Sequence, residues 1–184
     1  MRTLTGNHVI TAENAAEYAD VGVIEGYARI YADCPALTSV GGYARIYADC
    51  PALTSVGGNA NIHADCPALT SVEGYARIHA DCPALTSVGG HKILPEAEQI
   101  KYRRLVVAHV LNEAELDMSG WGVENGKLCG TTACMGGWAQ VEAPDGPLKR
   151  VHPSTAGVVL LGTKAAAFFH KDNEAAREWA KGWA

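Results

Sequence analysis

The chain has no long apolar run and no segment with an excess of basic residues. No eighteen consecutive apolar residues occur among its 184, which argues against a transmembrane helix and a membrane partner. Residues 1–6 are not followed by the apolar core of a signal peptide, so we expect a cytoplasmic protein. Residues 26–90 hold three basic and five acidic residues, and residues 91–184 hold eleven of each. Without a basic segment to neutralise phosphates, the composition argues against nucleic-acid binding.

A unit of sixteen residues occurs four times between Gly26 and Gly89. A short fixed period means that each copy is one structural unit that stacks on its neighbours. In the first copy, residues 27–34 alternate in the period of a β-strand with one buried face. We expect the inward side chains to be Ala28, Ile30, Ala32 and Cys34, and the outward ones to be Tyr27, Arg29, Tyr31 and Asp33.

The second half of each unit returns the chain to the start of the next strand. Pro35 lacks a backbone donor, so we expect it to end the strand. Leu37 and Val40 should re-enter the core, and the pair Gly41 and Gly42 should turn the chain. The repeat therefore predicts a short parallel β-solenoid with coils of sixteen residues.

Residues 6–12 align with residues 26–32, and residues 21–25 align with residues 37–41. The first coil is then a degenerate copy with an insertion of four residues, and residues 13–20 have a helix-favouring composition. A terminal repeat that departs from the consensus is typical of a cap on a solenoid. We therefore expect residues 1–90 to form a β-solenoid of five coils.

The repeat resembles the short leucine-rich-repeat-like arrays of bacterial and phage proteins. Ile30, Cys34, Leu37 and Val40 carry this resemblance, together with their equivalents in the next three copies. The unit is shorter than the usual leucine-rich repeat and lacks its asparagine at the strand end. We therefore expect a flat coil with two short strands, and no helices on a convex side.

The pattern changes after Gly90, and we place a domain boundary near His91. Helical spacing of apolar residues predicts a helix from Pro95 to about Leu116. Ser154 and Asp172 are expected to cap two later helices. Residues 91–184 should form a small all-α domain packed on the solenoid, which makes the whole chain an α+β protein.

Residues 95–184 resemble an uncharacterised domain of phage and bacterial proteins. Its motif runs Trp, a short gap, then Cys-Gly-Thr-x-x-Cys-x-Ala-Gly-Trp-Ala. The matching residues are Trp121, Cys129, Gly130, Thr131, Cys134, Gly137, Trp138 and Ala139. This chain has Ala133 where members often have His, and Gly136 where Ala is usual. The resemblance implies a phage or prophage origin, and hence the host cytoplasm, but no activity.

The six cysteines fall into two groups. Four share one repeat position and are expected to form a buried column of small apolar side chains, namely Cys34, Cys50, Cys66 and Cys82. Cys129 and Cys134 leave three alternatives open. They are a metal site with His152 or His170, a nucleophilic Cys134 with His109 or His152 as base, or two structural thiols beside Trp121 and Trp138.

Stacking of the coils predicts columns of identical side chains on the outer strand face. The expected partner-binding residues on this face are Tyr27, Arg29, Tyr31, Tyr43, Arg45, Tyr47, Asn61, His63, Tyr75, Arg77 and His79. Tyr and Arg are enriched at binding hot spots. Arginines about 4.8 Å apart repel each other, so the column invites an anionic partner unless neighbouring aspartates or aromatic stacking already compensate. The alternative is a set of ladders that satisfy themselves and bind nothing. The third of the four copies is an exception, because Asn59 and Asn61 replace the tyrosine and the arginine of these columns.

These observations favour a non-enzymatic interaction protein without a cofactor. Its outer face would bind a host protein or an anionic small ligand, and inhibition of a bacterial defence system would be the context of a phage protein. The alternatives are a thiol-dependent enzyme or metal site at Cys129 and Cys134, and a sponge that holds a small phosphorylated molecule between the two domains. An open C-terminal edge would also permit a homo-oligomer.

Overall fold

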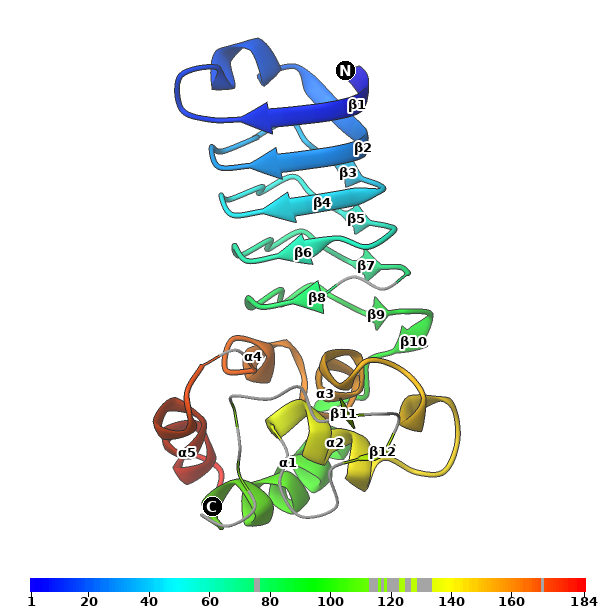
Figure 1. Ribbon diagram of the computed structural model, residues 1–184, viewed down its shortest axis with the longest axis vertical. Coiled ribbons are helices and arrows are strands. Elements are labelled where there is room, and N and C mark those ends of the chain that lie inside the picture. Colours follow the sequence, from blue (N-terminus) through cyan, green and yellow to red (C-terminus); the bar gives the residue numbers. More distant parts are fainter. Residues whose placement is uncertain are drawn as a thin grey trace. The chain divides into compact units, whose positions relative to one another are not determined.

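The computed structural model describes residues 1–74, 77–112, 116, 118, 123–124, 127–128, 134–169 and 171–184. The chain divides into two compact units, Met1–Lys92 and Ile93–Ala184. The first is a stack of strands and the second is mostly helical (Figure 1). The predicted α+β chain, with a parallel β-solenoid followed by helices, is confirmed.

The first unit is a parallel β-solenoid with two strand faces. β1 and β2 run across both faces, and later coils contribute one short strand to each. The elements are β1 (Arg2–Ile10), the 3-10 helix η1 (Ala15–Tyr18), β2 (Val21–Ile30), β3 (Ser39–Val40), β4 (Tyr43–Ile46), β5 (Ser55–Val56), β6 (Asn61–Ile62), β7 (Ser71–Val72), β8 (Arg77–Ile78), β9 (Ser87–Val88) and β10 (His91–Lys92). On one face β2, β4, β6 and β8 pair in parallel, and on the other β2, β3, β5, β7 and β9 do so. β10 folds back antiparallel on β9.

The degenerate first coil lies where the sequence predicts it. β1 pairs with β2 so that Gly6 lies opposite Gly26 and Ile10 opposite Ile30. The inserted residues contain the helix η1, as their composition indicates. The coil thus pairs with its neighbour in the same register as the regular repeats, and the insertion is accommodated outside the ladder.

Alternation along the strands builds the core. Ile30, Ile46 and Ile62 are fully buried, as are Leu53 and Leu69 on the return segment. Full burial of one such side chain contributes roughly 1.5–3 kcal/mol. Because each coil adds the same residues, the core is a set of aliphatic columns along the stack.

The predicted extent of the strands is wrong at their C-terminal end. β2 ends at Ile30 and does not reach Cys34, and Ala32 is only half-buried. Pro35 lies in a turn in which the amide of Leu37 donates to the carbonyl of Cys34 at 3.2 Å. The fixed φ of proline suits the second position of such a turn, so Pro35 shapes the corner after the strand has ended.

The return segment is held by threonine ladders. The hydroxyl of Thr54 donates to the carbonyl of Thr38 at 3.1 Å, and that of Thr70 donates to the carbonyl of Thr54 at 3.0 Å. The backbone amides of the same threonines also donate to the preceding threonine carbonyl. These hydroxyls therefore join successive coils.

The cysteine column is buried as predicted. Cys50, Cys66 and Cys82 have no exposed surface, and Cys34 is 4% exposed. All four are free thiols, and the thiols of Cys34, Cys50 and Cys66 donate to carbonyls two residues earlier. A hydrogen bond with Cys34 and burial together raise the pKa of the Cys50 thiol. The column therefore packs as small apolar side chains.

The second unit contains five α-helices among its described residues. They are α1 (Glu96–Leu111), α2 (Met135–Glu142), α3 (Pro153–Leu161), α4 (Thr163–Ala166) and α5 (Asn173–Lys181), accompanied by the strand pair β11 (Val123–Glu124) and β12 (Lys127–Leu128) and the 3-10 helix η2 (Pro147–Lys149). None of the described helices has the length and apolarity needed to cross a membrane.

Several helix boundaries differ from the predictions. α1 ends at Leu111, earlier than the predicted end near Leu116, because Asn112 is extended with ψ 110°. α3 is capped by His152, whose Nδ1 accepts the amide of Ser154, so the predicted cap at Ser154 is wrong by two residues. Asp172 caps α5 as predicted, and its carboxylate accepts the amide of Ala175 at 2.9 Å.

A buried arginine joins the helices of the second unit. Arg103 is 3% exposed, and its Nε donates to the carbonyl of Leu161 at 2.7 Å. Its guanidinium also bonds Glu96 and Gln99 and lies 4.1 Å from the ring centre of Trp183. This arginine therefore has a structural role and is not available to a ligand.

Candidate functional site

The outer strand face is formed by the outward side chains of β2, β4, β6 and β8 and of the residues that follow each strand. Register places Arg29 opposite Arg45, Arg45 opposite Asn61, and Asn61 opposite Arg77. Tyr27 lies opposite Tyr43 in the same way. The predicted columns are therefore present in the part of the face that the structure describes.

Four aromatic side chains form one continuous ladder beside the arginines. Tyr31 and Tyr47 have parallel rings with centroids 5.0 Å apart, and Tyr47 and His63 follow at 4.7 Å. His63 and His79 continue the ladder at 4.3 Å. Each ring packs on its neighbour, so this column matches the alternative of a self-satisfied ladder.

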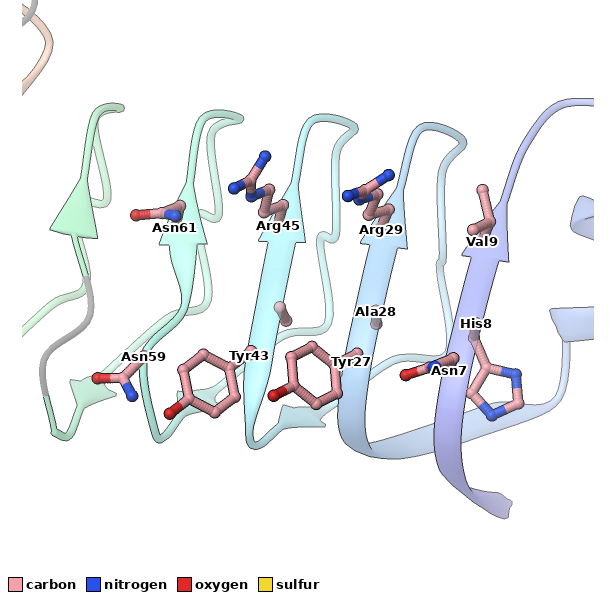
Figure 2. Close-up of a pocket in the computed structure, with 11 residues that line it drawn as sticks. Asn7, His8, Val9, Tyr27, Ala28, Arg29, Tyr43, Arg45, Asn59 and Asn61 are labelled. Carbon is pink, nitrogen blue, oxygen red and sulfur yellow. The ribbon is translucent and has the colours of Figure 1, made fainter.

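Tyr27 and Tyr43 form a second, shorter aromatic pair. Their rings are parallel within 7°, their centroids are 5.0 Å apart, and they are 58% and 53% exposed. Asn59 takes the next position in this column. Figure 2 shows the two rings side by side with their faces turned to the viewer. The two rings pack on each other as those of Tyr31 and Tyr47 do, and more than half of each side chain remains exposed to solvent.

Arg29 and Arg45 differ from the aromatic columns, because no carboxylate among the described residues compensates their charges. Arg29 and Arg45 are exposed, and neither has an ion-pair partner among the described residues. Their strands are about 4.8 Å apart, and like charges directly opposite each other destabilise a sheet. The neighbouring aspartates Asp33, Asp49 and Asp65 form no ion pair with these two arginines in the described part of the chain.

A groove lies between the short tyrosine pair and the two arginines. Its volume is about 530 Å³. We call it the tyrosine–arginine groove, and it is lined by Asn7, His8, Val9, Tyr27, Ala28, Arg29, Tyr43, Ala44, Arg45, Asn59 and Asn61. Figure 2 shows Tyr27 and Tyr43 on one side of it and Arg29 and Arg45 on the other, with Asn59 and Asn61 on the next coil. One side of the groove is aromatic and the other is cationic.

The charge of Arg45 also reaches the histidine of the neighbouring coil. The pKa of His63 is lowered, first by partial burial and then by the positive charge of Arg45. This coupling favours the neutral imidazole. The positive charge on this part of the face is therefore concentrated on the arginines.

The structure assembles only part of the predicted set into the groove. Tyr27, Arg29, Tyr43, Arg45 and Asn61 line it. The members outside it are Tyr31, Tyr47, His63 and His79 in the long ladder, and Arg77 on β8. Tyr75 lies outside the described residues.

Sequence reasoning missed the end of the groove formed by the first coil. Asn7 and Val9 pair with Tyr27 and Arg29, so they occupy the tyrosine and arginine positions of that coil. His8 also lines the groove, and its Nε2 lies 2.9 Å from the carbonyl oxygen of Thr5. The alignment of residues 6–12 with residues 26–32 held the signal that identifies Asn7 and Val9.

The alternative site at Cys129 and Cys134 is only partly within the described residues, because Cys129 and His170 lie outside them. Cys134 is 2% exposed and caps α2, with its sulfur accepting the amide of Gly137 at 3.4 Å. Nδ1 of His152 lies 2.7 Å from Oγ of Ser154. Within the described part of the chain, no three side chains of His, Cys, Asp or Glu come together as metal ligands.

His109, considered as a base for Cys134, has other contacts. Its ring is parallel to that of Trp138 with centroids 3.8 Å apart, and its Nε2 lies 2.9 Å from Oε1 of Glu142. Both partners belong to α2. These contacts join α1 to α2 within the helical unit.

Comparisons with protein-family models, with curated proteins and with solved structures found no match. The resemblances to leucine-rich-repeat-like arrays and to a phage domain therefore stay predictions. The geometry of the outer strand face is the basis for the function proposed below.

Proposed function

We propose that the protein is a non-enzymatic binding protein that holds an anionic partner on its outer strand face. The observation that supports this is the pair Arg29 and Arg45, which face solvent on adjacent strands without a carboxylate partner among the described residues. Their mutual repulsion disfavours the folded solenoid. An anion that bound both would remove this cost.

The contrast with the aromatic columns strengthens the proposal. The long aromatic ladder gains ring contacts within the protein itself, as expected if the repeat only stabilises the stack. Arg29 and Arg45 have no such internal contact with a carboxylate in the described part of the chain. A guanidinium group is also the side chain best shaped to bind carboxylate or phosphate with two parallel hydrogen bonds.

The biological context is a further proposal. Buried free cysteines are typical of a reducing compartment, which supports the cytoplasm as the place of action. A phage origin and inhibition of a bacterial defence protein rest on the resemblance of residues 95–184 alone. A homo-oligomer also stays a prediction.

Capture from a bacterial extract tests the binding function. The immobilised protein is compared with the double variant Arg29→Ala/Arg45→Ala, and retained proteins and small molecules are identified by mass spectrometry. We expect a salt-sensitive partner on the wild type that the double variant loses, because charge-assisted hydrogen bonds are removed. Thermal unfolding should show that the double variant is as stable as the wild type or slightly more so, since a like-charge pair is gone.

A matched control separates this site from general surface charge. The variant Arg104→Ala/Lys164→Ala also removes two exposed positive charges, but from the helices α1 and α4. It should retain the partner as the wild type does. The proposal is wrong if Arg29→Ala/Arg45→Ala captures the same molecules as the wild type.

A further inference from the structure

The tyrosine–arginine groove carries positive charge over only two coils. Arg29 and Arg45 provide it, whereas the same column continues as Val9 on one side and Asn61 on the other. A long polyanion needs a row of cations along its whole length. A short cationic segment instead matches one compact anionic group.

The size of the groove agrees with a small ligand. Its volume of about 530 Å³ lies within the range of roughly 300–1,000 Å³ that is typical of small-molecule sites. Arg29 and Arg45 lie opposite each other on strands that are about 4.8 Å apart. Each guanidinium offers two parallel donors, so both can bond one phosphate placed between them.

The opposite side of the groove provides a surface for a ring. The parallel rings of Tyr27 and Tyr43 expose more than half of their surface, and aromatic faces bind sugar and base rings by stacking. Asn7 and Asn59 stand at the two ends of this pair (Figure 2) and offer amide donors and acceptors to ring substituents.

We propose that the groove binds a small organic phosphate, with the phosphate between Arg29 and Arg45 and its sugar or base ring on Tyr27 and Tyr43. This inference rests on the proposed function and names the class of its ligand. The Asn59 and Asn61 coil is central to it, because a Tyr and an Arg at these positions would extend both columns and favour a longer anion.

Isothermal titration calorimetry with four probes tests the inference. The probes are adenosine monophosphate, ribose 5-phosphate, inorganic phosphate and adenosine. We expect adenosine monophosphate and ribose 5-phosphate to bind more tightly than inorganic phosphate, and adenosine without phosphate to bind least. If the two organic phosphates bind equally, the sugar ring lies on the tyrosines, and if the nucleotide binds more tightly, the base does.

Double variants test which side of the groove binds the phosphate and which side binds the ring. Arg29→Ala/Arg45→Ala should weaken binding of both organic phosphates by about 10- to 100-fold, the range expected when charged hydrogen bonds are lost. Tyr27→Ala/Tyr43→Ala should reduce the affinity for the organic phosphates to that for inorganic phosphate. Arg104→Ala/Lys164→Ala should leave all affinities unchanged.

NMR of the wild-type protein tests the inference even if one of the variants does not fold. Addition of adenosine monophosphate should shift the NMR signals of the Nε–H groups of Arg29 and Arg45, while that of Arg104 stays in place. Equal affinity for inorganic and organic phosphate, or shifts at Arg104 alone, would overturn the inference.

The inference and the proposed function can fail separately. If none of the phosphate probes binds, but the wild type still captures a partner that Arg29→Ala/Arg45→Ala loses, the inference is wrong and the proposed function stands. If neither capture nor titration depends on these arginines, both are wrong.

Discussion

Single glycines determine how closely successive coils approach. Gly58 has φ +70°, and a Cβ built on it would lie 2.2 Å from the carbonyl oxygen of Gly42. A Cβ built on Gly42 would lie 2.3 Å from the carbonyl oxygen of Gly26. A side chain at these positions therefore meets both a strained backbone and the backbone of the preceding coil.

Two adjacent glycines give a sharp test of this constraint. Gly58→Ala should lower the free energy of unfolding by at least about 2 kcal/mol, from left-handed backbone strain and the clash together. Gly57→Ala should change it by less than about 1 kcal/mol, because a Cβ there meets no atom within 4 Å. Urea unfolding of both variants measures the difference, and equal effects would contradict the account.

At the scale of the strands, stacking turns each repeated residue into a column with its own energetics. Buried isoleucines and leucines gain from identical neighbours because apolar contacts are non-directional. Aromatic rings also gain, as the ladder from Tyr31 to His79 shows. Arg29 and Arg45 lose, since like charges directly opposite each other repel. The same repetition therefore stabilises most columns and leaves this arginine pair to favour an external anion.

The pH dependence of His63 tests the coupling between neighbouring columns. Its pKa lies below 6.5 in the folded chain, from burial first and Arg45 second. Below pH 6.5 the unfolded chain binds more protons at this residue, so the contribution of His63 to stability falls as the pH drops through its folded pKa. Above pH 6.5 that contribution is constant.

NMR titration of the His63 ring measures this coupling directly. In Arg45→Ala the pKa of His63 should rise toward 6.5 without reaching it, because burial is the larger cause and remains. Arg104→Ala, which removes a charge from α1, should leave it unchanged. An identical pKa in the wild type and Arg45→Ala would show that the arginine does not act on this ring.

At the scale of the whole chain, the two units have separate cores. The solenoid core is built from aliphatic columns such as Leu53 and Leu69, and the helical core includes Phe169 and Trp179. All four tryptophans follow residue 92 in the sequence, whereas six of the seven tyrosines precede it. Tryptophan fluorescence therefore reports on the helical unit alone.

Core variants should unfold one unit at a time. Leu53→Ala should destabilise the solenoid by about 2–5 kcal/mol and lower the transition seen by circular dichroism of the strands, while leaving the tryptophan fluorescence transition in place. Phe169→Ala should lower the tryptophan fluorescence transition and leave the circular dichroism transition of the strands in place. If both signals shift together in each variant, the two units unfold as one.

The candidate site was predictable only in part. The sixteen-residue period was enough to place Arg29 beside Arg45 and Tyr27 beside Tyr43, because parallel stacking in register follows from the repeat. It did not separate these residues from the ladder of Tyr31, Tyr47, His63 and His79, which has the same periodicity. Whether the side chains of a column contact each other or a neighbouring column depends on distances between side chains, which the repeat period does not specify.

The sequence by itself determined the solenoid, its buried columns and its degenerate first coil, because strand alternation and a fixed repeat length are local properties of the chain. The tertiary structure decided where the strands end, which residue caps α3, and that Arg29 and Arg45 have no ion-pair partner among the described residues. The surroundings of the two arginines depend on residues sixteen apart in the sequence, which come together only when the coils stack. The strand end and the α3 cap depend on local turn and cap hydrogen bonds that periodicity does not specify.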